Sequence, residues 1–267
     1  MVSTIGAAVL AVAPAGVARA GGDDDLERVA KSADELAKSG GAQFRGTTTA
    51  KTAGPDAKVT FDGRFHFSQR AGEYLVDAAA IGLLGSGQVR ALLVDGTMFF
   101  SLDTLASEDR PDLAGKKWLR FDPTILGEEG QLGQTDPNGS IDALRGATGK
   151  VEDLGTETIR GERTTHYRVR INPALAVKKA PEDVRELARA AVRPFGSKVI
   201  PADVWIDDAD RLRKLRFRVG DGSLARPRGS VGFEYFDLGA EVSVESPPPD
   251  QVLDFSDILG GSTDAGS

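Results

Sequence analysis

Cysteine is absent from the 267-residue sequence, which excludes disulfide bonds, thiolate metal sites and cysteine nucleophiles. Histidine is scarce, because only His66 and His166 supply an imidazole group. Hydrophobic residues make up 40% of the chain and charged residues 27%, a composition typical of a globular protein. The net charge is −7, and the acidic residues are scattered rather than gathered in blocks, so we expect no nucleic-acid partner.

Motifs of common catalytic and metal sites are also missing. Residues 85–87 lack the spacing of a nucleophile elbow, and no phosphate loop or dinucleotide fingerprint occurs. A calcium loop counted from Asp207 places Leu212 at its sixth position and Arg218 at its twelfth, where glycine and glutamate are needed. Both histidines fall on predicted polar faces of strands. We therefore expect a non-enzymatic protein with no cofactor and no metal site.

The N-terminal segment predicts export from the cytoplasm. Residues 5–17 are small and apolar, Ala18-Arg19-Ala20 fits the A-x-A cleavage rule, and an acidic run follows. The apolar run is too short to span a bilayer. No lysine or arginine precedes it, and the alternative is a disordered alanine-rich tail. We expect residues 1–20 to be a signal peptide.

The rest of the sequence predicts one helix followed mainly by strands. Helical spacing of apolar residues begins at Asp23, with acidic residues in the first turn, and Gly40 and Gly41 end the helix. Alternation of apolar and polar residues then predicts strands at 44–50, 59–67, 73–79, 89–94, 97–102, 117–121, 150–159, 164–171, 198–206, 212–219 and 229–238. Asp95-Gly96 suits a tight hairpin turn.

Two further helices and several irregular segments complete the prediction. A short helix is expected at 141–147, and a longer one after Pro181 whose apolar face carries Val184, Leu187, Ala188 and Ala191. Residues 127–140 predict a polar loop, 242–257 an extended proline-rich segment and 259–267 a disordered tail. Short turns between consecutive strands favour antiparallel pairing. We predict one α+β domain over residues 21–258, in which a curved antiparallel half-barrel sheet has helices packed on its concave face.

Apolar side chains on the predicted N-terminal strands are candidates for lining a ligand cavity. They are Phe44, Phe61, Phe65, Phe67, Leu75, Leu92, Met98 and Phe100. Such residues usually form a core, but a wide sheet covered by only two sizeable helices has room for an unfilled pocket. From the residues alone, core and cavity stay equal alternatives.

Basic residues gather on a predicted polar strand face formed by Lys214, Arg216 and Arg218, with Arg168 and Arg170 nearby. This face either meets anionic lipid head groups or is simply solvated, and solvation is the simpler interpretation.

The C-terminal two-thirds of the chain resembles the LolA-like exported lipid carriers of actinobacteria, especially the LppX/LprG type of lipoprotein. The similarity lies in the following elements: Gly155-Thr-Glu157 with Ile159, Gly161, Thr164, Thr165 and Tyr167; Pro201 and residues 203–207; residues 211–214; residues 235–239; and Val242, Val244, Pro247 and Pro248. Before Lys116 only the alternating pattern is similar.

The resemblance implies a half-barrel that encloses an apolar cavity for acyl chains. It implies a non-enzymatic carrier or chaperone whose partner is a lipid or acylated molecule, with a membrane surface or a membrane transporter as a further candidate partner. The alternative is an envelope sensor or regulatory interaction module on the same scaffold. Ala20-Gly21 stands where such proteins have a lipidated cysteine, which argues against a lipid anchor. We expect a monomer that is exported to the cell envelope or secreted.

Overall fold

The computed structural model describes residues 19–50, 57–77, 87–103, 115–121, 137–182, 185–192, 199–220 and 227–255. Within these residues one sheet of thirteen strands runs in the order β1-β8-β9-β10-β11-β12-β2-β3-β4-β5-β6-β7-β13. The strands are β1 (Arg19–Ala20), β2 (Gly41–Ala50), β3 (Ala57–His66), β4 (Ala71–Asp77), β5 (Gln88–Val94), β6 (Thr97–Ser101), β7 (Trp118–Phe121), β8 (Ala147–Ile159), β9 (Glu162–Ile171), β10 (Ile200–Asp207), β11 (Leu212–Gly220), β12 (Pro227–Phe236) and β13 (Val252–Asp254). Because β1 and β13 lie at opposite ends of this order, the sheet is open.

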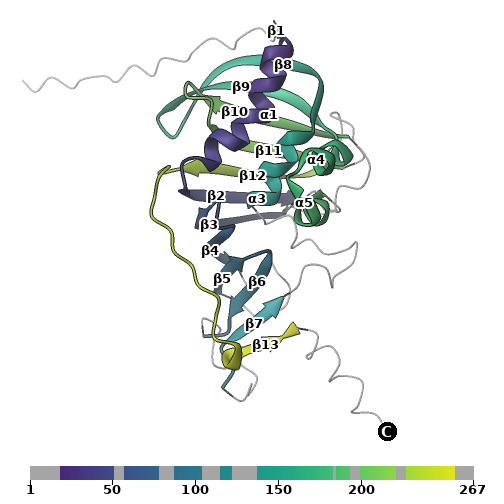
Figure 1. The fold of residues 1–267 in the computed structure, drawn as a ribbon. Coiled ribbons are helices and arrows are strands. Elements are labelled where there is room, and N and C mark those ends of the chain that lie inside the picture. The colour runs from purple at the N-terminus through teal and green to yellow at the C-terminus, as the bar shows by residue number, and fades with distance from the viewer. Residues whose placement is uncertain are drawn as a thin grey trace, which may run out of the picture.

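The helices of the described chain lie on one face of the sheet (Figure 1). They are α1 (Asp23–Ala37), α3 (Pro137–Ala143) with the 3-10 turn η4 (Leu144–Gly146), α4 (Pro173–Lys179) and α5 (Arg185–Val192). Helix α1 crosses strands β8, β10 and β11, while α3, α4 and α5 pack against one another beside it (Figure 1). The predicted α+β class, with helices on one side of a large curved antiparallel sheet, is confirmed.

Helix α1 forms where its sequence predicts it. Asp25 accepts a hydrogen bond from the Gly22 backbone N–H at 3.0 Å. The acidic residues of the first turn also interact favourably with the positive end of the helix dipole. Its buried face presents Val29, Ala33 and Leu36 to the sheet. Tyr167 on β9 anchors the helix, because its hydroxyl donates to Asp25 at 3.1 Å.

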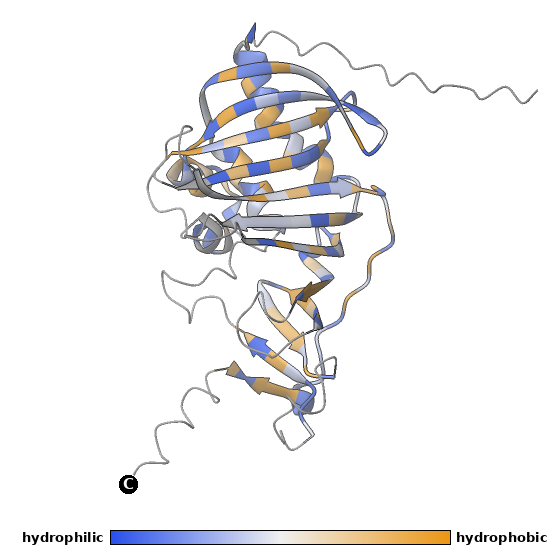
Figure 2. Cartoon of the chain, turned by 180° about the vertical axis from the view of Figure 1, so that it is seen from behind, coloured by the Kyte–Doolittle hydropathy of each residue, from blue (hydrophilic) through white to orange (hydrophobic). Residues whose placement is uncertain are grey.

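Alternation along the strands divides the sheet into two faces. One row that points toward the helices consists of Tyr167, Val204, Leu215, Phe233 and Phe61, with Gly46 between the last two. The adjoining row on the outer face consists of His166, Trp205, Lys214, Glu234, Arg45, Asp62, Leu75 and Arg90. Figure 2, seen from behind, shows the resulting alternation of hydrophilic and hydrophobic residues along the strands.

Phenylalanine rings on the concave face lie directly over glycines of neighbouring strands. A methyl group at Gly46 would lie 2.1 Å from Cζ of Phe61, and one at Gly72 would lie 2.2 Å from Cδ2 of Phe65. Only glycine therefore allows these rings to lie flat across the next strand. Such glycine positions let a sheet bend while its aromatic residues stay packed.

The structure differs from the sequence prediction in three places. Helix α4 was not expected, although Asn172 caps it by accepting a hydrogen bond from Leu175 N at 3.2 Å and Pro173 occupies its first turn. Helix α3 begins at Pro137, inside the predicted 127–140 loop. The trailing segment ends in β13, which pairs with β7 in parallel rather than antiparallel orientation.

Some expected segments lie outside the described residues. They include most of the expected signal peptide, at 1–18, the expected tail at 259–267 and Val184 of the predicted helix that follows Pro181. Arg19 and Ala20 form β1 against β8, so cleavage after Ala20 would remove this strand.

Replacing Gly46 with alanine tests the ring-over-glycine packing. We expect Gly46→Ala to lower the free energy of unfolding by about 1–3 kcal/mol, because the new methyl group overlaps the Phe61 ring. In a Phe61→Leu background, which lacks the ring tip, the same change should cost clearly less. Urea unfolding of the four proteins measures both costs, and equal costs in the two backgrounds would contradict this packing.

Candidate functional site

The concave face carries a cluster of aromatic rings drawn from four adjacent strands. Phe44 lies at its centre, with ring centroids 6.2 Å from Phe61, 6.1 Å from Tyr74 and 6.1 Å from Phe233. Phe61 and Phe233 are 5.9 Å apart and meet edge to face. All four rings are buried. This cluster forms an apolar wall on the helix-bearing side of β12, β2, β3 and β4.

The structure separates the eight predicted cavity residues into two groups. Seven are buried: Phe44, Phe61, Phe65, Phe67, Leu92, Met98 and Phe100. Leu75 is 48% exposed, and its partners across the sheet, Asp62 and Arg90, belong to the outer face. Leu92 is buried but also belongs to the outer face by register, since it pairs with Glu73 on one side and Phe99 on the other. The concave wall therefore contains six of the eight.

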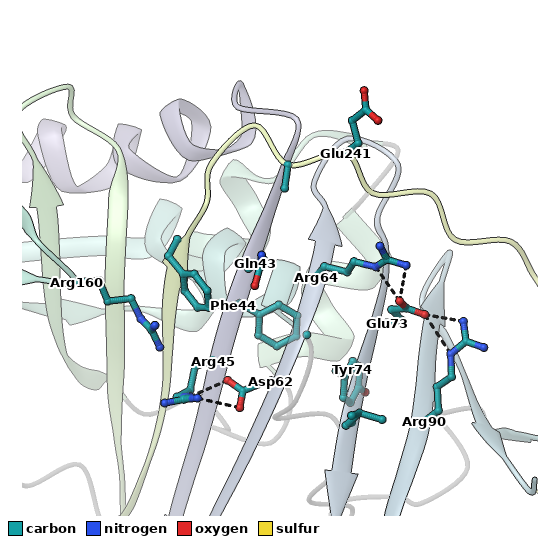
Figure 3. A pocket seen from close by; sticks show the side chains of 14 residues that line it. Gln43, Phe44, Arg45, Asp62, Arg64, Glu73, Tyr74, Arg90, Arg160 and Glu241 are labelled. Carbon is teal, nitrogen blue, oxygen red and sulfur yellow. Dashed lines mark hydrogen bonds and ion pairs between the residues drawn. The ribbon is translucent and has the colours of Figure 1, made fainter. Parts of the chain in front are cut away.

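A groove of about 740 Å³ lies on the outer face over β12, β2, β3, β4 and β5 (Figure 3). It is lined by Gln43, Phe44, Arg45, Asp62, Gly63, Arg64, Glu73, Tyr74, Leu75, Arg90, Arg160, Phe236, Ala240 and Glu241. Half of these residues are charged, and the sequence analysis named none of the charged ones as a site residue. Their signal in the sequence is the alternation itself: the polar residues between the apolar ones of the same strands point to the opposite face of the sheet.

Two arginines share one carboxylate at the β4–β5 end of the groove. Arg64 Nε donates to Glu73 Oε1 at 2.7 Å, and Arg90 Nη2 donates to Oε2 at 2.6 Å (Figure 3). Burial acts to raise the pKa of the Glu73 carboxyl, but the hydrogen bonds from Arg90 and Arg64 outweigh it and lower the pKa. Glu73 is therefore ionised at neutral pH, and this end carries one surplus positive charge.

A similar arrangement occurs at the β12 end of the groove. Glu234 accepts from Lys214 Nζ at 2.8 Å and from Arg160 Nε at 3.3 Å. Burial acts to raise the pKa of the Glu234 carboxyl, but Lys214 and then Arg160 outweigh it and lower the pKa. Arg160 belongs to the turn between β8 and β9, and its guanidinium lies 3.8 Å from the ring centroid of Phe236. A cation–π contact thus holds this turn over the outer face.

Three arginines of the basic strand face that was expected to be solvated share one buried carboxylate. Asp203 on β10 is fully buried and accepts hydrogen bonds from Arg168 Nε at 3.0 Å, Arg216 Nη2 at 2.9 Å and Arg218 Nη2 at 2.8 Å. Burial alone would raise the pKa of this carboxyl, but hydrogen bonds from His166, Arg218 and Arg216 hold the pKa well below its usual range. Three arginines on one carboxylate form a clamp across β9, β10 and β11.

The two histidines occupy different surroundings. His166 is buried, stacks on Trp205 with ring centroids 4.1 Å apart, and has its Nδ1 2.7 Å from Glu157 Oε1. His66 stands at the end of β3, where its Nδ1 accepts from Gln69 N at 3.3 Å. Both histidines have local structural partners, and they lie on strands far apart in the sheet.

The described residues contain no cluster of three or more histidine, aspartate or glutamate side chains arranged to hold a metal ion. Within the same residues, every helix is too short or too polar to cross a membrane.

Sequence comparison finds relatives in Streptomyces. A 31.2 kDa Streptomyces griseus protein from the rplA–rplJ intergenic region is 28% identical over 194 residues, and the match covers 67% of this chain and 61% of that protein. A Streptomyces coelicolor protein named as a candidate lipoprotein is 27% identical over 158 residues, covering 55% and 45% of the two chains. This chain thus spans under two-thirds of the length of either relative. It matches no protein-family model.

Structure comparison finds two mycobacterial proteins with the same fold, one of which is named a lipoprotein. Lipoprotein LppX of Mycobacterium tuberculosis superposes with a TM-score of 0.52 at 20% identity, covering 84% of this chain and all of LppX (100%). LprF of Mycobacterium bovis gives a TM-score of 0.51 at 14% identity, covering 86% and 99% of the two chains. The resemblance to LppX-type lipoproteins that the sequence indicates is confirmed at the level of the fold.

Asp203→Asn tests the clamp. Because the pKa of Asp203 is lower in the folded protein than in the unfolded chain, its stabilising contribution is complete above the unfolded value, near 3.8, and declines as pH falls below it. We expect the variant to lose about 3 kcal/mol of unfolding free energy at pH 7, since it leaves three arginines around a neutral group. The difference from wild type should shrink below about pH 4.

Urea titrations at pH 7 and pH 3.5 measure this difference. Glu73→Gln is the matched control, because its ion pairs lie at the surface and contribute about 1 kcal/mol or less. Similar losses in the two variants at pH 7 would contradict a special role for Asp203.

Proposed function

We propose that this protein is an exported, non-enzymatic carrier or chaperone that binds a lipid or acyl chain on the concave face of its sheet. The observation that carries the proposal is the apolar wall of Phe44, Phe61, Tyr74 and Phe233, which lies on the helix-bearing side of an open sheet. The fold shared with LppX supports it, because LppX is a lipoprotein, and so does the similarity to a Streptomyces coelicolor protein named as a candidate lipoprotein. The A-x-A segment at 18–20 supports export.

Reversible transfer follows from the physics of an apolar site. Removing a methylene group from water contributes about 0.8 kcal/mol, so an acyl chain leaves a membrane only for another apolar surface. Membrane and protein interior offer the chain similar surroundings. A carrier of this kind therefore needs no energy source of its own, and it binds the chains while polar head groups stay at the wet rim.

Native mass spectrometry of the full chain, purified without detergent from an actinobacterial host, tests the proposal. We expect a population heavier than the polypeptide by the mass of one or more acyl-bearing molecules, which organic extraction releases. A chain that carries no such mass, and takes up none from added lipid vesicles, would defeat the proposal.

Photo-labelling locates the site. A hexadecanoic acid that carries a diazirine should label peptides of the concave wall, because the acyl chain lies against Phe61 and Tyr74. Outer-face labelling around Leu75, or none, would contradict a concave site.

A side chain that pushes two methylene groups of the bound acyl chain out of the apolar site and into water would cost about 1.6 kcal/mol, roughly fifteenfold in affinity. Ala91→Phe adds a ring on the concave face of β5, and it should weaken binding of the same fatty acid by about that factor. Leu75→Phe adds a ring on the outer face of the adjacent strand and should leave binding unchanged. Circular dichroism serves as the check that both variants are folded. Equal affinity of both variants for the fatty acid would place it elsewhere.

A further inference from the structure

The outer-face groove has a charge distribution that the lipid-carrier proposal does not use. At one end, Arg64 and Arg90 share Glu73, and at the other, Arg160 and Lys214 share Glu234. Between them, Arg45 and Asp62 form a bidentate pair at 2.7 and 3.0 Å, which is neutral as a unit. Each of these two groups carries one surplus positive charge, on a chain whose net charge is −7. Arg64, Arg90, Glu73 and Arg160 line the groove, while Lys214 and Glu234 lie beside it.

The arginines at both ends keep donors that a ligand can use. The side chains of Arg64 and Arg90 are 48% and 49% exposed, and that of Arg160 is 33% exposed. A guanidinium has five N–H donors in a fixed fork, and the pairs with Glu73 and Glu234 occupy only some of them. Figure 3 shows Glu241, the remaining acidic residue of the lining, pointing away from these pairs.

The middle of the groove offers an apolar contact. Leu75 lies there with about half of its surface exposed, and among the described residues it is the one large hydrophobic side chain that is exposed. Its cross-strand partners, Asp62 and Arg90, flank it. An apolar group that covered Leu75 would remove this surface from water.

The two ends are too far apart for one small anion. Glu234 on β12 and Glu73 on β4 are separated by three strand spacings, about 14 Å at roughly 4.8 Å each. An extended peptide advances about 3.3 Å per residue, so about four residues cover this distance. A recess walled by Arg160 on one side and by Ala240 and Glu241 on another also suits a chain segment better than a flat lipid surface.

We propose that this groove is a docking site for an extended acidic peptide segment of a partner protein. Acidic side chains about four residues apart would contact Arg64 and Arg90 at one end and Arg160 at the other, and an apolar residue between them would cover Leu75. Charge complementarity selects the partner, and the site lies on the face opposite the proposed lipid site. The two proposals therefore stand or fall separately.

Fluorescence anisotropy tests the docking site with a labelled heptapeptide that has aspartate at its second and sixth positions, leucine at its fourth and serine elsewhere, so that the two acidic side chains are four residues apart. We expect the full chain to bind it at least tenfold more tightly than the same peptide with asparagines or lysines in place of the aspartates. Added salt should weaken the binding, because exposed charges are screened. Equal binding of the asparagine peptide would overturn the proposal.

Variants assign the contacts. Arg64→Gln and Arg160→Gln should each weaken binding of the aspartate peptide at least threefold. Arg120→Gln is the matched control, since Arg120 is a half-exposed outer-face arginine paired with Asp254 outside the groove. Exposed ion pairs contribute little to stability, so all three variants are expected to fold. Equal weakening by Arg120→Gln would overturn the proposal.

Anionic vesicles separate a peptide partner from a membrane. If phosphatidylglycerol vesicles bind the wild type but not Arg64→Gln, while the aspartate peptide binds neither, the groove is a membrane contact and the proposal is wrong. Labelling by the diazirine fatty acid should be the same in Arg64→Gln as in wild type. This readout keeps failure at the groove distinguishable from failure of the lipid proposal.

Discussion

The packing of phenylalanine rings over glycines of the next strand is the contact on which the rest of the molecule depends. Phe61 lies over Gly46 and Phe65 over Gly72, a packing that lets a sheet bend while its concave side stays filled with aromatic surface. That bend gives the sheet a concave side, which the helices occupy, and an outer side that faces water (Figure 1). Since successive side chains point to opposite faces, each strand supplies both sides at once.

The two faces carry different chemistry, and this division organises the functional proposals. The concave face is aromatic and buried, which suits a ligand whose transfer from a membrane is nearly neutral in free energy. The outer face is a lattice of ion pairs, and across the groove its charges balance except at the two ends. Recognition of an apolar chain and recognition of a charged segment can therefore occur on one sheet without competing for the same side chains.

Ion pairs on the outer face do not all contribute equally to the stability of the fold. Asp203 is fully buried beneath three arginines, so its charge is part of the folded structure and cannot be removed without leaving those arginines unpaired. The pairs around Glu73 and Arg45 lie at the surface, where water competes for every hydrogen bond. The first group fixes β9, β10 and β11 together, and the second can exchange its partners for those of a ligand.

The sequence by itself determined the alternation of strands, the first helix, the hairpin at Asp95-Gly96 and the α+β class, because these depend on neighbouring residues and local periodicity. It also indicated the LppX-type fold. Even the missed helix α4 had its signal in Asn172 and Pro173. Only the tertiary structure decided that Leu75 faces outward, that Asp203 gathers Arg168, Arg216 and Arg218, and that Arg160 reaches Phe236. Arg160 and Phe236 are far apart in the chain, and Asp203 meets its arginines through the register of three paired strands, which the alternation within a single strand does not give.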